Sequence, residues 1–136
     1  MICLGTSGAM KLIRPEAHSG NLSRWFRERL GIPVISSVLI EVELIRATWR
    51  SAPDRASRAA DVLRGIGVVT LSPSVVARAA GYANPDLRSL DAIHLATAEH
   101  VVSVTRRPLE AFIAYDERLL LAALQAGIPA IAPGLS

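Results

Sequence analysis

Residues 88–98 read Arg-Ser-Leu-Asp-Ala-Ile-His-Leu-Ala-Thr-Ala, which is typical of the start of a buried helix. Ser89 can serve as the N-cap, and Asp91 falls in the first turn, where the helix macrodipole favours an anion. The apolar residues that give this helix a packing face are Leu90, Ile93, Leu95, Ala96 and Ala98. Asp91 is therefore either a helix-capping acid or, beside so many apolar positions, a metal ligand. The rest of the chain is needed to choose between these interpretations.

Short apolar runs alternate with helical segments on both sides of this stretch. We expect strands at residues 2–4, 34–35, 68–71, 111–115 and 128–131, and helices at 9–14, 19–30, 38–50, 53–64, 73–83, 89–102 and 117–126. Strands that alternate with helices form parallel sheets with helices on both faces. The sequence therefore predicts an α/β protein with a five-stranded parallel sheet, in one domain spanning residues 1–136. In such sheets ligands bind beyond the carboxyl ends of the strands, at the topological switch point.

Composition limits the remaining possibilities. Hydrophobic residues make up 51% of the chain, enough for a sizeable core. There is no apolar run of about 18 residues, as a membrane span needs, and no signal peptide is visible. The single cysteine, Cys3, lies in an apolar run and is expected to be buried. Because one cysteine cannot form an internal disulfide, we expect a cytoplasmic protein. Fourteen arginines and one lysine give a net charge of +3, which permits a nucleic-acid partner.

Carboxylates lie at the ends of several expected elements. Asp116 follows the strand at 111–115, Asp91 opens a helix at the same edge, and Glu43 lies two turns into the helix at 38–50. Glu41 points to a different face from Glu43, since residues i and i+2 are not neighbours on a helix. We favour Glu43 as the inward acid and keep Glu41 as the alternative. Converging carboxylates need a cation or bound protons, and oxygen ligands select Mg²⁺ or Mn²⁺, which can activate water and hold a phosphodiester.

Four segments in this order resemble the PIN-domain ribonucleases, and in particular the VapC toxins of type II toxin–antitoxin modules. They are Met1–Ser7 with Lys11-Leu12, Glu43–Ala47, Ser89–Ala96 and Ala114–Leu119. The resemblance covers essentially the whole chain and implies a PIN-like three-layer α/β/α fold and a homodimer. It also implies an Mg²⁺-dependent endoribonuclease that cuts RNA such as a tRNA loop, and a cognate antitoxin that blocks the acidic site. By the same resemblance, Glu43, Asp91 and Asp116 match the family's acidic, metal-binding positions.

Gly5 departs from the family pattern. The family has an aspartate at the end of the first strand, followed by Thr-Ser, and it is a principal metal ligand there. Here Thr6 and Ser7 are present, but Gly5 stands at the position of the acid. We therefore expect weaker metal binding and impaired activity. The chain is a natural degenerate copy, or the residue was changed so that a toxic protein could be expressed, or Glu41 or a water fills the gap. We favour the second explanation because the other acids are intact.

Other polar residues have two interpretations each. Thr6 and Ser7 either orient a metal-bound water or the scissile phosphate, or cap a helix, or do both. His94 either helps to bind RNA or the antitoxin, or is a partly buried helix residue. The candidate phosphate contacts are Arg46, Arg88 and Arg107, with Arg50 and Arg106 beside them, and each of these is otherwise a solvated charge.

Two further functions compete with the nuclease. One is a catalytically dead PIN-like module that still dimerises and binds an antitoxin. The other is a receiver-like signalling domain, which has the same layered architecture and an acidic pocket. A receiver needs a phosphoacceptor aspartate at the end of a central strand and paired acids near the first strand. Neither feature is visible in this sequence, so the receiver is the weaker candidate.

Overall fold

The structure is a computed structural model that describes residues 1–135. Its strands are β1 (Ile2–Leu4), β2 (Val34–Ser37), β3 (Gly67–Val69), β4 (Ala111–Ile113) and β5 (Ala130–Ile131). Its α-helices are α1 (Thr6–Ile13), α2 (Ser19–Arg27), α3 (Leu39–Ser51), α4 (Ala56–Arg64), α5 (Pro73–Ala80), α6 (Ser89–Thr105) and α7 (Glu117–Gln125), and a 3₁₀ turn, η1 (Pro53–Arg55), precedes α4. Each predicted element is therefore present, although most of the ends are shifted by a few residues.

The strands form one parallel sheet of five strands in the order β3-β2-β1-β4-β5, which confirms the predicted class. The order reverses direction between β1 and β4, where Cys3 is in register with Phe112. This is the topological switch point of the sheet. The residues that follow β1 and β4 therefore lie at the edge where ligands bind in sheets of this kind.

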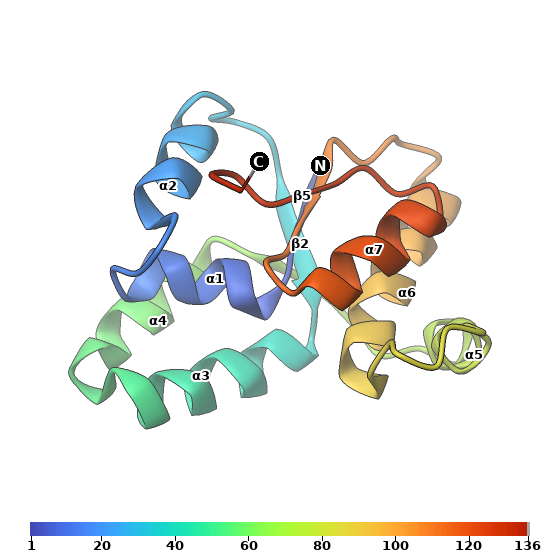
Figure 1. Cartoon of the computed structure of the whole chain (residues 1–136), viewed down its shortest axis with the longest axis horizontal. Coiled ribbons are helices and arrows are strands. Elements are labelled where there is room, and N and C mark those ends of the chain that lie inside the picture. The colour runs from blue at the N-terminus through green and yellow to red at the C-terminus, as the bar shows by residue number, and fades with distance from the viewer. Residues whose placement is uncertain (136) are drawn as a thin grey trace.

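Helices cover both faces of the sheet (Figure 1). Alternate residues of β1 pack in the two layers. Ile2 and Leu4 pack in a core formed with α1, α2, α3 and α4. Cys3 and Phe112 pack in a second core with α6 and α7. The predicted three-layer α/β/α arrangement is thus confirmed, and Cys3 is buried as expected. Among residues 1–135, no helix has the length and apolar character that crossing a bilayer requires.

The layout brings the starts of α1, α3 and α6 to the carboxyl edge of the sheet. α1 begins at Thr6, directly after β1, and α3 and α6 run back against the strand direction, so their first turns lie at the same edge. Gly8 lets α1 pack closely there, because a Cβ at this position would meet Leu4 Cδ1 at 2.8 Å and Ile113 Cγ2 at 3.1 Å. The close approach of α1 positions the Thr6 hydroxyl for the contact described below.

Several predicted helix starts and surfaces were wrong in detail. α6 begins at Ser89 itself, and its N-cap is Arg88 rather than the predicted Ser89. Leu90 was expected on the buried face of this helix, but it is 49% exposed. α1 likewise begins at Thr6, with Gly5 as its N-cap, so the capping role considered for Thr6 and Ser7 does not hold.

Candidate metal and nuclease site

Glu43 is the inward acid of α3, as predicted. Its side chain is 24% exposed, whereas Glu41 lies on the exposed surface of the helix. The Thr6 hydroxyl donates to Glu43 Oε1 at 3.1 Å, and His94 Nε2 lies 2.5 Å from the same oxygen. Thr6 and His94 come from α1 and α6, on either side of α3 in sequence. Glu43 is therefore held in place by two neighbouring helices.

His94 is a core residue that contacts Glu43. It is only 2% exposed, so the interpretation of His94 as a surface contact for RNA or an antitoxin is wrong. Its Nε2 donates to the Glu43 carboxylate when that group is ionised. The other ring nitrogen, Nδ1, is buried and has no hydrogen-bond partner among residues 1–135. The imidazole thus fixes the position of Glu43 through one nitrogen only.

Asp91 lies half-buried in the first turn of α6. Burial raises the pKa of its carboxyl above the ordinary value, and the negative charges of Asp116 and Glu43 raise this pKa further. The charges of His94 and Arg88 act in the opposite direction but do not cancel the rise. Asp116 and Glu43 are therefore close enough to Asp91 for their charges to act on it.

Asp116 is exposed and serves as the N-cap of α7, where its Oδ1 accepts a hydrogen bond of 3.0 Å from the Leu119 amide. The strand before it ends at Ile113, two residues earlier than predicted. Asp116 thus has a structural role in addition to its charge near Asp91. A second carboxylate oxygen remains for another partner, because only Oδ1 takes part in the cap.

Gly5 lies at the switch point between β1 and β4. Its amide donates to the Ile113 carbonyl at 2.9 Å, and its backbone angles, φ −80° and ψ 164°, suit any residue. A Cβ at Gly5 would lie 3.1 Å from the Ile113 carbonyl oxygen. The Ser7 hydroxyl accepts a hydrogen bond of 3.0 Å from the Tyr115 amide, which joins α1 to the segment after β4. Gly5, Thr6 and Ser7 therefore all lie at the edge that carries the acids.

The donor set suits a hard cation but is incomplete. Glu43, Asp91 and Asp116 offer carboxylate oxygens, the ligands that Mg²⁺ and Mn²⁺ prefer. The pKa of Asp91 is raised first by burial, and the charges of Asp116 and Glu43 add to this rise. Within residues 1–135, however, no group of three or more His, Cys, Asp or Glu side chains is arranged to hold a metal ion. Gly5 contributes no side-chain ligand, so these acids do not form a preassembled cage.

The candidate phosphate contacts are distributed unevenly. Arg46 lines a groove next to Glu43. Arg88 lies close enough to Asp91 for its charge to oppose the rise in the pKa of Asp91. Arg107 follows the far end of α6, about 20 Å along the helix from Asp91 at 1.5 Å per residue. The structure therefore brings Arg46 and Arg88 to the acidic edge and leaves Arg107 at the opposite end of the helix.

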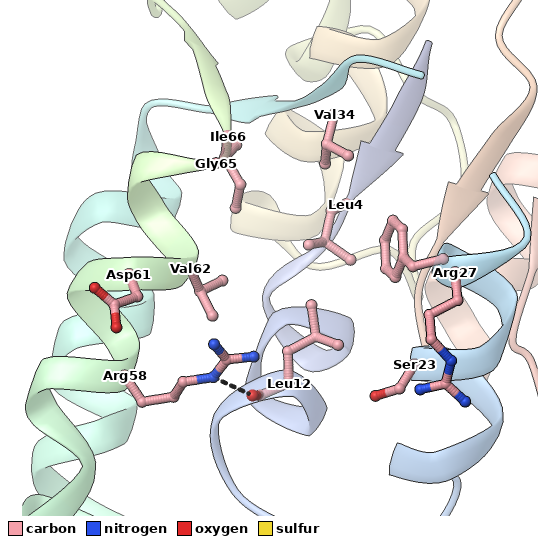
Figure 2. A pocket seen from close by; sticks show the side chains of 11 residues that line it. Leu4, Leu12, Ser23, Arg27, Val34, Arg58, Asp61, Val62, Gly65 and Ile66 are labelled. Atoms are coloured by element: carbon pink, nitrogen blue, oxygen red, sulfur yellow. Dashed lines mark hydrogen bonds between the residues drawn. The ribbon is translucent and has the colours of Figure 1, made fainter. Parts of the chain in front are cut away.

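A separate cavity of about 440 Å³ lies away from the acids (Figure 2). Leu4, Leu12 and Val62 form part of its apolar lining, and Arg27 and Arg58 are the cations beside it. Arg58 Nε donates to the Leu12 carbonyl at 3.1 Å. The acids identified from the sequence are not among its lining residues, so this cavity is not the candidate catalytic site.

Sequence reasoning missed the tertiary supports of the acids. The bonds of Glu43 to His94 and of Ser7 to the Tyr115 amide span 51 and 108 residues. One signal was available for His94, since it lies three residues after Asp91 and one turn of helix places them near the same edge. The Ser7 contact gave no such signal, because its partner is a backbone amide.

Comparison with known proteins gives a consistent result. Residues 2–125 match the PIN domain family. The chain is 42% identical to ribonuclease VapC35 of Mycobacterium tuberculosis over 134 residues, which cover 98% of both chains. It is 35% identical to ribonuclease VapC47 of the same species over 137 residues, with 98% of both chains covered.

Two solved structures share the fold. VapC20 of Mycobacterium tuberculosis, described as a sarcin–ricin loop cleaving toxin, superposes with a TM-score of 0.70 at 17% identity, covering 98% of this chain and 100% of that one. A toxin–antitoxin complex from Klebsiella pneumoniae gives a TM-score of 0.67 at 18% identity, with 98% of both chains covered. The family match and the near full-length relatives agree with the layered fold and the acidic edge, and the chain therefore belongs to the PIN-domain family, among the VapC-type toxins.

Proposed function

We propose that this chain is a divalent-metal-dependent endoribonuclease toxin in which Glu43, Asp91 and Asp116 would hold Mg²⁺ or Mn²⁺. The observation that carries the proposal is the half-buried Asp91 carboxyl at this edge, whose pKa is raised first by burial and then by the charges of Asp116 and Glu43. Repelling carboxylates at a ligand-binding edge favour a cation there. Bound at this edge, the ion would supply positive charge for phosphate oxygens and lower the pKa of a bound water.

The chain's own residues would orient the site. Thr6 and His94 fix one oxygen of Glu43, which leaves the other carboxylate oxygen free. Thr6 and Ser7 begin α1 directly above the switch point, where they would help to position the scissile phosphate. Arg46 and Arg88 would contact phosphates near the acids. Arg107 would contact only RNA that extends to the opposite end of α6.

We further propose that Gly5 impairs the activity. By resemblance, this position carries the family's first acidic ligand, and the chain has no side chain there. The incomplete arrangement of metal-binding groups within residues 1–135 agrees with this view. The same observation favours a second candidate function, a PIN-like module that has lost catalysis but still dimerises and binds an antitoxin.

The partners follow from the same relatives. The chain resembles the toxin fold seen in a toxin–antitoxin complex, and its relatives are named ribonucleases. We therefore propose an RNA substrate, such as a structured tRNA, a cognate antitoxin and a homodimer. None of these partners requires a membrane.

The test is RNA cleavage by the chain after complete removal of any antitoxin under denaturing conditions and refolding. Total tRNA would be incubated with Mg²⁺ and separately with EDTA, using Asp91→Asn as the matched control. We expect slow cleavage that needs Mg²⁺ and disappears in Asp91→Asn. Cleavage that persists in EDTA or in the variant would refute the metal site. No cleavage at all by this chain, together with retained antitoxin binding, would favour the binding module.

A further inference from the structure

The segment between β4 and α7 carries Asp116 but belongs to neither element. β4 ends at Ile113, and α7 begins at Glu117. The Asp116 side chain is exposed, and among residues 1–135 its carboxylate accepts one hydrogen bond, from the Leu119 amide. The direction in which this acid points therefore depends on how the chain just before it is held.

Tyr115 holds that segment through both its backbone and its ring. Its amide donates to the Ser7 hydroxyl of α1 at 3.0 Å, and its own hydroxyl donates to the Pro133 carbonyl at 2.8 Å. The Lys11 ammonium of α1 lies 4.4 Å from the centre of the ring, within the range of a cation–π contact. The His18 ring stacks on the Tyr115 ring with their centres 6.2 Å apart. Three separate parts of the chain therefore meet at one side chain.

The two neighbours of the Tyr115 ring are themselves fixed. The Lys11 side chain is 11% exposed, and its ammonium donates to the Ala17 carbonyl at 2.8 Å and pairs with Glu16 at 3.4 Å. His18 has a φ of +69°, a left-handed conformation that is uncommon outside glycine. A residue keeps such a conformation only where its surroundings impose it. Lys11 and His18 are thus fixed contacts for Tyr115.

The partner of the Tyr115 hydroxyl lies in a tight turn at residues 132–135. The Leu135 amide donates to the Ala132 carbonyl at 2.9 Å, with Pro133 and Gly134 at the two central positions. Gly134 has a φ of +98°. A type II turn prefers proline at its first central position and needs a positive φ at its second, which glycine adopts readily. The sequence of this turn therefore fixes where the Pro133 carbonyl points.

This turn packs directly on the residues around the ring. A Cβ at Gly134 would lie 2.6 Å from His18 Nδ1 and 2.8 Å from Asn21 Oδ1, so only glycine fits there without a shift. The turn therefore contacts His18, which stacks on Tyr115, and it also accepts the Tyr115 hydrogen bond. We call this closed set of contacts the Tyr115 cluster, which consists of Lys11, His18, Tyr115, Pro133 and Gly134.

We infer that Tyr115 is a positioning residue for Asp116, held in place by the turn at residues 132–135. The Tyr115 cluster fixes the backbone where the chain leaves β4, and this backbone directs the Asp116 carboxylate toward Asp91. Mg²⁺ demands a near-octahedral arrangement of its ligands, so a small displacement of one carboxylate weakens its binding. This inference rests on the proposed function, in which Asp116 is a metal ligand, and it adds residues remote from the acids to the site.

The alternative is that these contacts only fasten the residues after β5 to the rest of the molecule. The place of Tyr115 in the fold favours the positioning role. Its ring packs against the core layer of α1 to α4, whereas Leu119 of α7 packs in the opposite layer. Asp116 lies where the chain crosses from one layer to the other. Loss of the ring contacts would therefore loosen the chain at the acid itself.

The variants remove the contacts of the cluster one at a time. Tyr115→Phe deletes only the hydroxyl that bonds to the turn, and Gly134→Ala forces the turn away from α2; the double variant combines them. Tyr82→Phe is the matched control for a lost tyrosine hydrogen bond, since its hydroxyl donates to Glu99 of α6. Gly31→Ala is the control for backbone strain, because φ is +89° there and no atom lies within 4 Å of the added Cβ.

Two measurements separate positioning from stability. Hydrogen exchange of the Leu119 amide, followed by NMR in EDTA, reports on Asp116 without metal, because this amide donates to the Asp116 carboxylate. Titration with Mn²⁺, with the free ion measured by electron paramagnetic resonance, gives the metal affinity. Circular dichroism and denaturant unfolding check the fold and the global stability of every variant.

We expect the Leu119 amide of Tyr115→Phe to exchange about 5-fold faster, as for loss of one hydrogen bond that limits local opening. The Kd for Mn²⁺ should rise about 10-fold, the lower end of the range for groups that orient metal ligands. Gly134→Ala should show both effects, and the double variant should be no worse than the more affected single variant, because both changes act through the same contacts. Tyr82→Phe and Gly31→Ala should lose stability but show neither effect.

Leu119 exchange in Tyr115→Phe that matches the exchange in Tyr82→Phe would overturn the inference and leave the Tyr115 cluster a purely structural device. Faster exchange with unchanged Mn²⁺ affinity would overturn it too, since a loosened Asp116 would then make no difference to the ion. Absence of Mn²⁺ binding by the unchanged chain would refute the proposed metal site instead. The Leu119 exchange, measured without metal, would still decide whether Tyr115 orients Asp116.

Discussion

Introducing an acid at position 5 is the sharpest test of the candidate site. In Gly5→Asp the backbone need not change, since φ −80° and ψ 164° are open to any residue. The new Cβ would lie 3.1 Å from the Ile113 carbonyl oxygen, so the end of β1 must shift by a few tenths of an ångström. Gly5→Asn has the same shape without the charge and is the matched control for this steric cost.

The added charge should make stability depend on metal. If the new carboxylate comes within about 7 Å of one of the other acids, Coulomb's law gives a repulsion of about 1–2 kcal/mol at an effective dielectric constant of 20–40. Without metal, Gly5→Asp should therefore be less stable than Gly5→Asn by about this amount, or about 3–8 °C in Tm for a chain of this size. Mg²⁺ at ten times its Kd would return about 1.4 kcal/mol to the unfolding free energy of Gly5→Asp.

Thermal unfolding of the three chains, with Mg²⁺ and with EDTA, measures these differences, and cleavage of total tRNA gives the second readout. We expect Mg²⁺ to raise the Tm of Gly5→Asp by more than it raises the Tm of Gly5→Asn. Only Gly5→Asp should cut RNA faster than the unchanged chain. Growth toxicity on expression should rise in parallel. If the Asp and Asn variants respond equally to Mg²⁺ and cut equally, position 5 is not a missing ligand position.

Three further predictions concern groups already placed in the structure. Asp116→Ala removes the α7 cap and should lose about 1 kcal/mol of unfolding free energy. Asp116→Asn keeps an acceptor for the Leu119 amide and should retain this stability. Denaturant unfolding should therefore separate the two variants, whereas RNA cleavage should fall in both. The pKa of Asp91 is higher in the folded state than in the unfolded state, so ionisation of Asp91 opposes folding. The resulting loss of unfolding free energy develops as pH rises from the pKa of the unfolded state through the pKa of the folded state. In metal-free buffer, the Tm of Asp91→Asn relative to the unchanged chain should therefore increase with pH and then level off, and a constant difference from pH 3 to 8 would contradict this. Burial raises the pKa of Cys3 to about 12, so a thiol reagent should react with it at pH 8 only after unfolding in guanidinium, and rapid labelling of the native chain would show that β1 is not buried.

The layered fold was predictable because it depends on the order and spacing of apolar residues. Short apolar runs between helices led to the parallel sheet, and the two-residue offset between Glu41 and Glu43 showed that they lie on different faces of α3. Both inferences use periodicity, which is a local property of the chain. The predicted element ends were less accurate, as in the strand at 111–115, whose last two residues lie outside β4.

The tertiary contacts of the site were not predictable in the same way. Thr6 resembled a helix cap, yet its hydroxyl donates to a carboxylate 37 residues away. Leu90 fitted an apolar helical face, but α6 leaves it beside the groove along α3.

The hydrogen bonds that Thr6 and His94 make to Glu43 bear on the choice between an impaired nuclease and a binding module. A module that only binds an antitoxin has no use for a buried histidine fixing one oxygen of Glu43, or for Thr6 donating to that same oxygen. Such a histidine, with one ring nitrogen lacking a partner among the described residues, costs stability that packing alone would avoid. These contacts orient a carboxylate toward the edge where Asp91 and Asp116 already repel each other. On the proposal that position 5 is a ligand position, these contacts hold Glu43 ready for a cation, and a single substitution at Gly5 should separate the two functions.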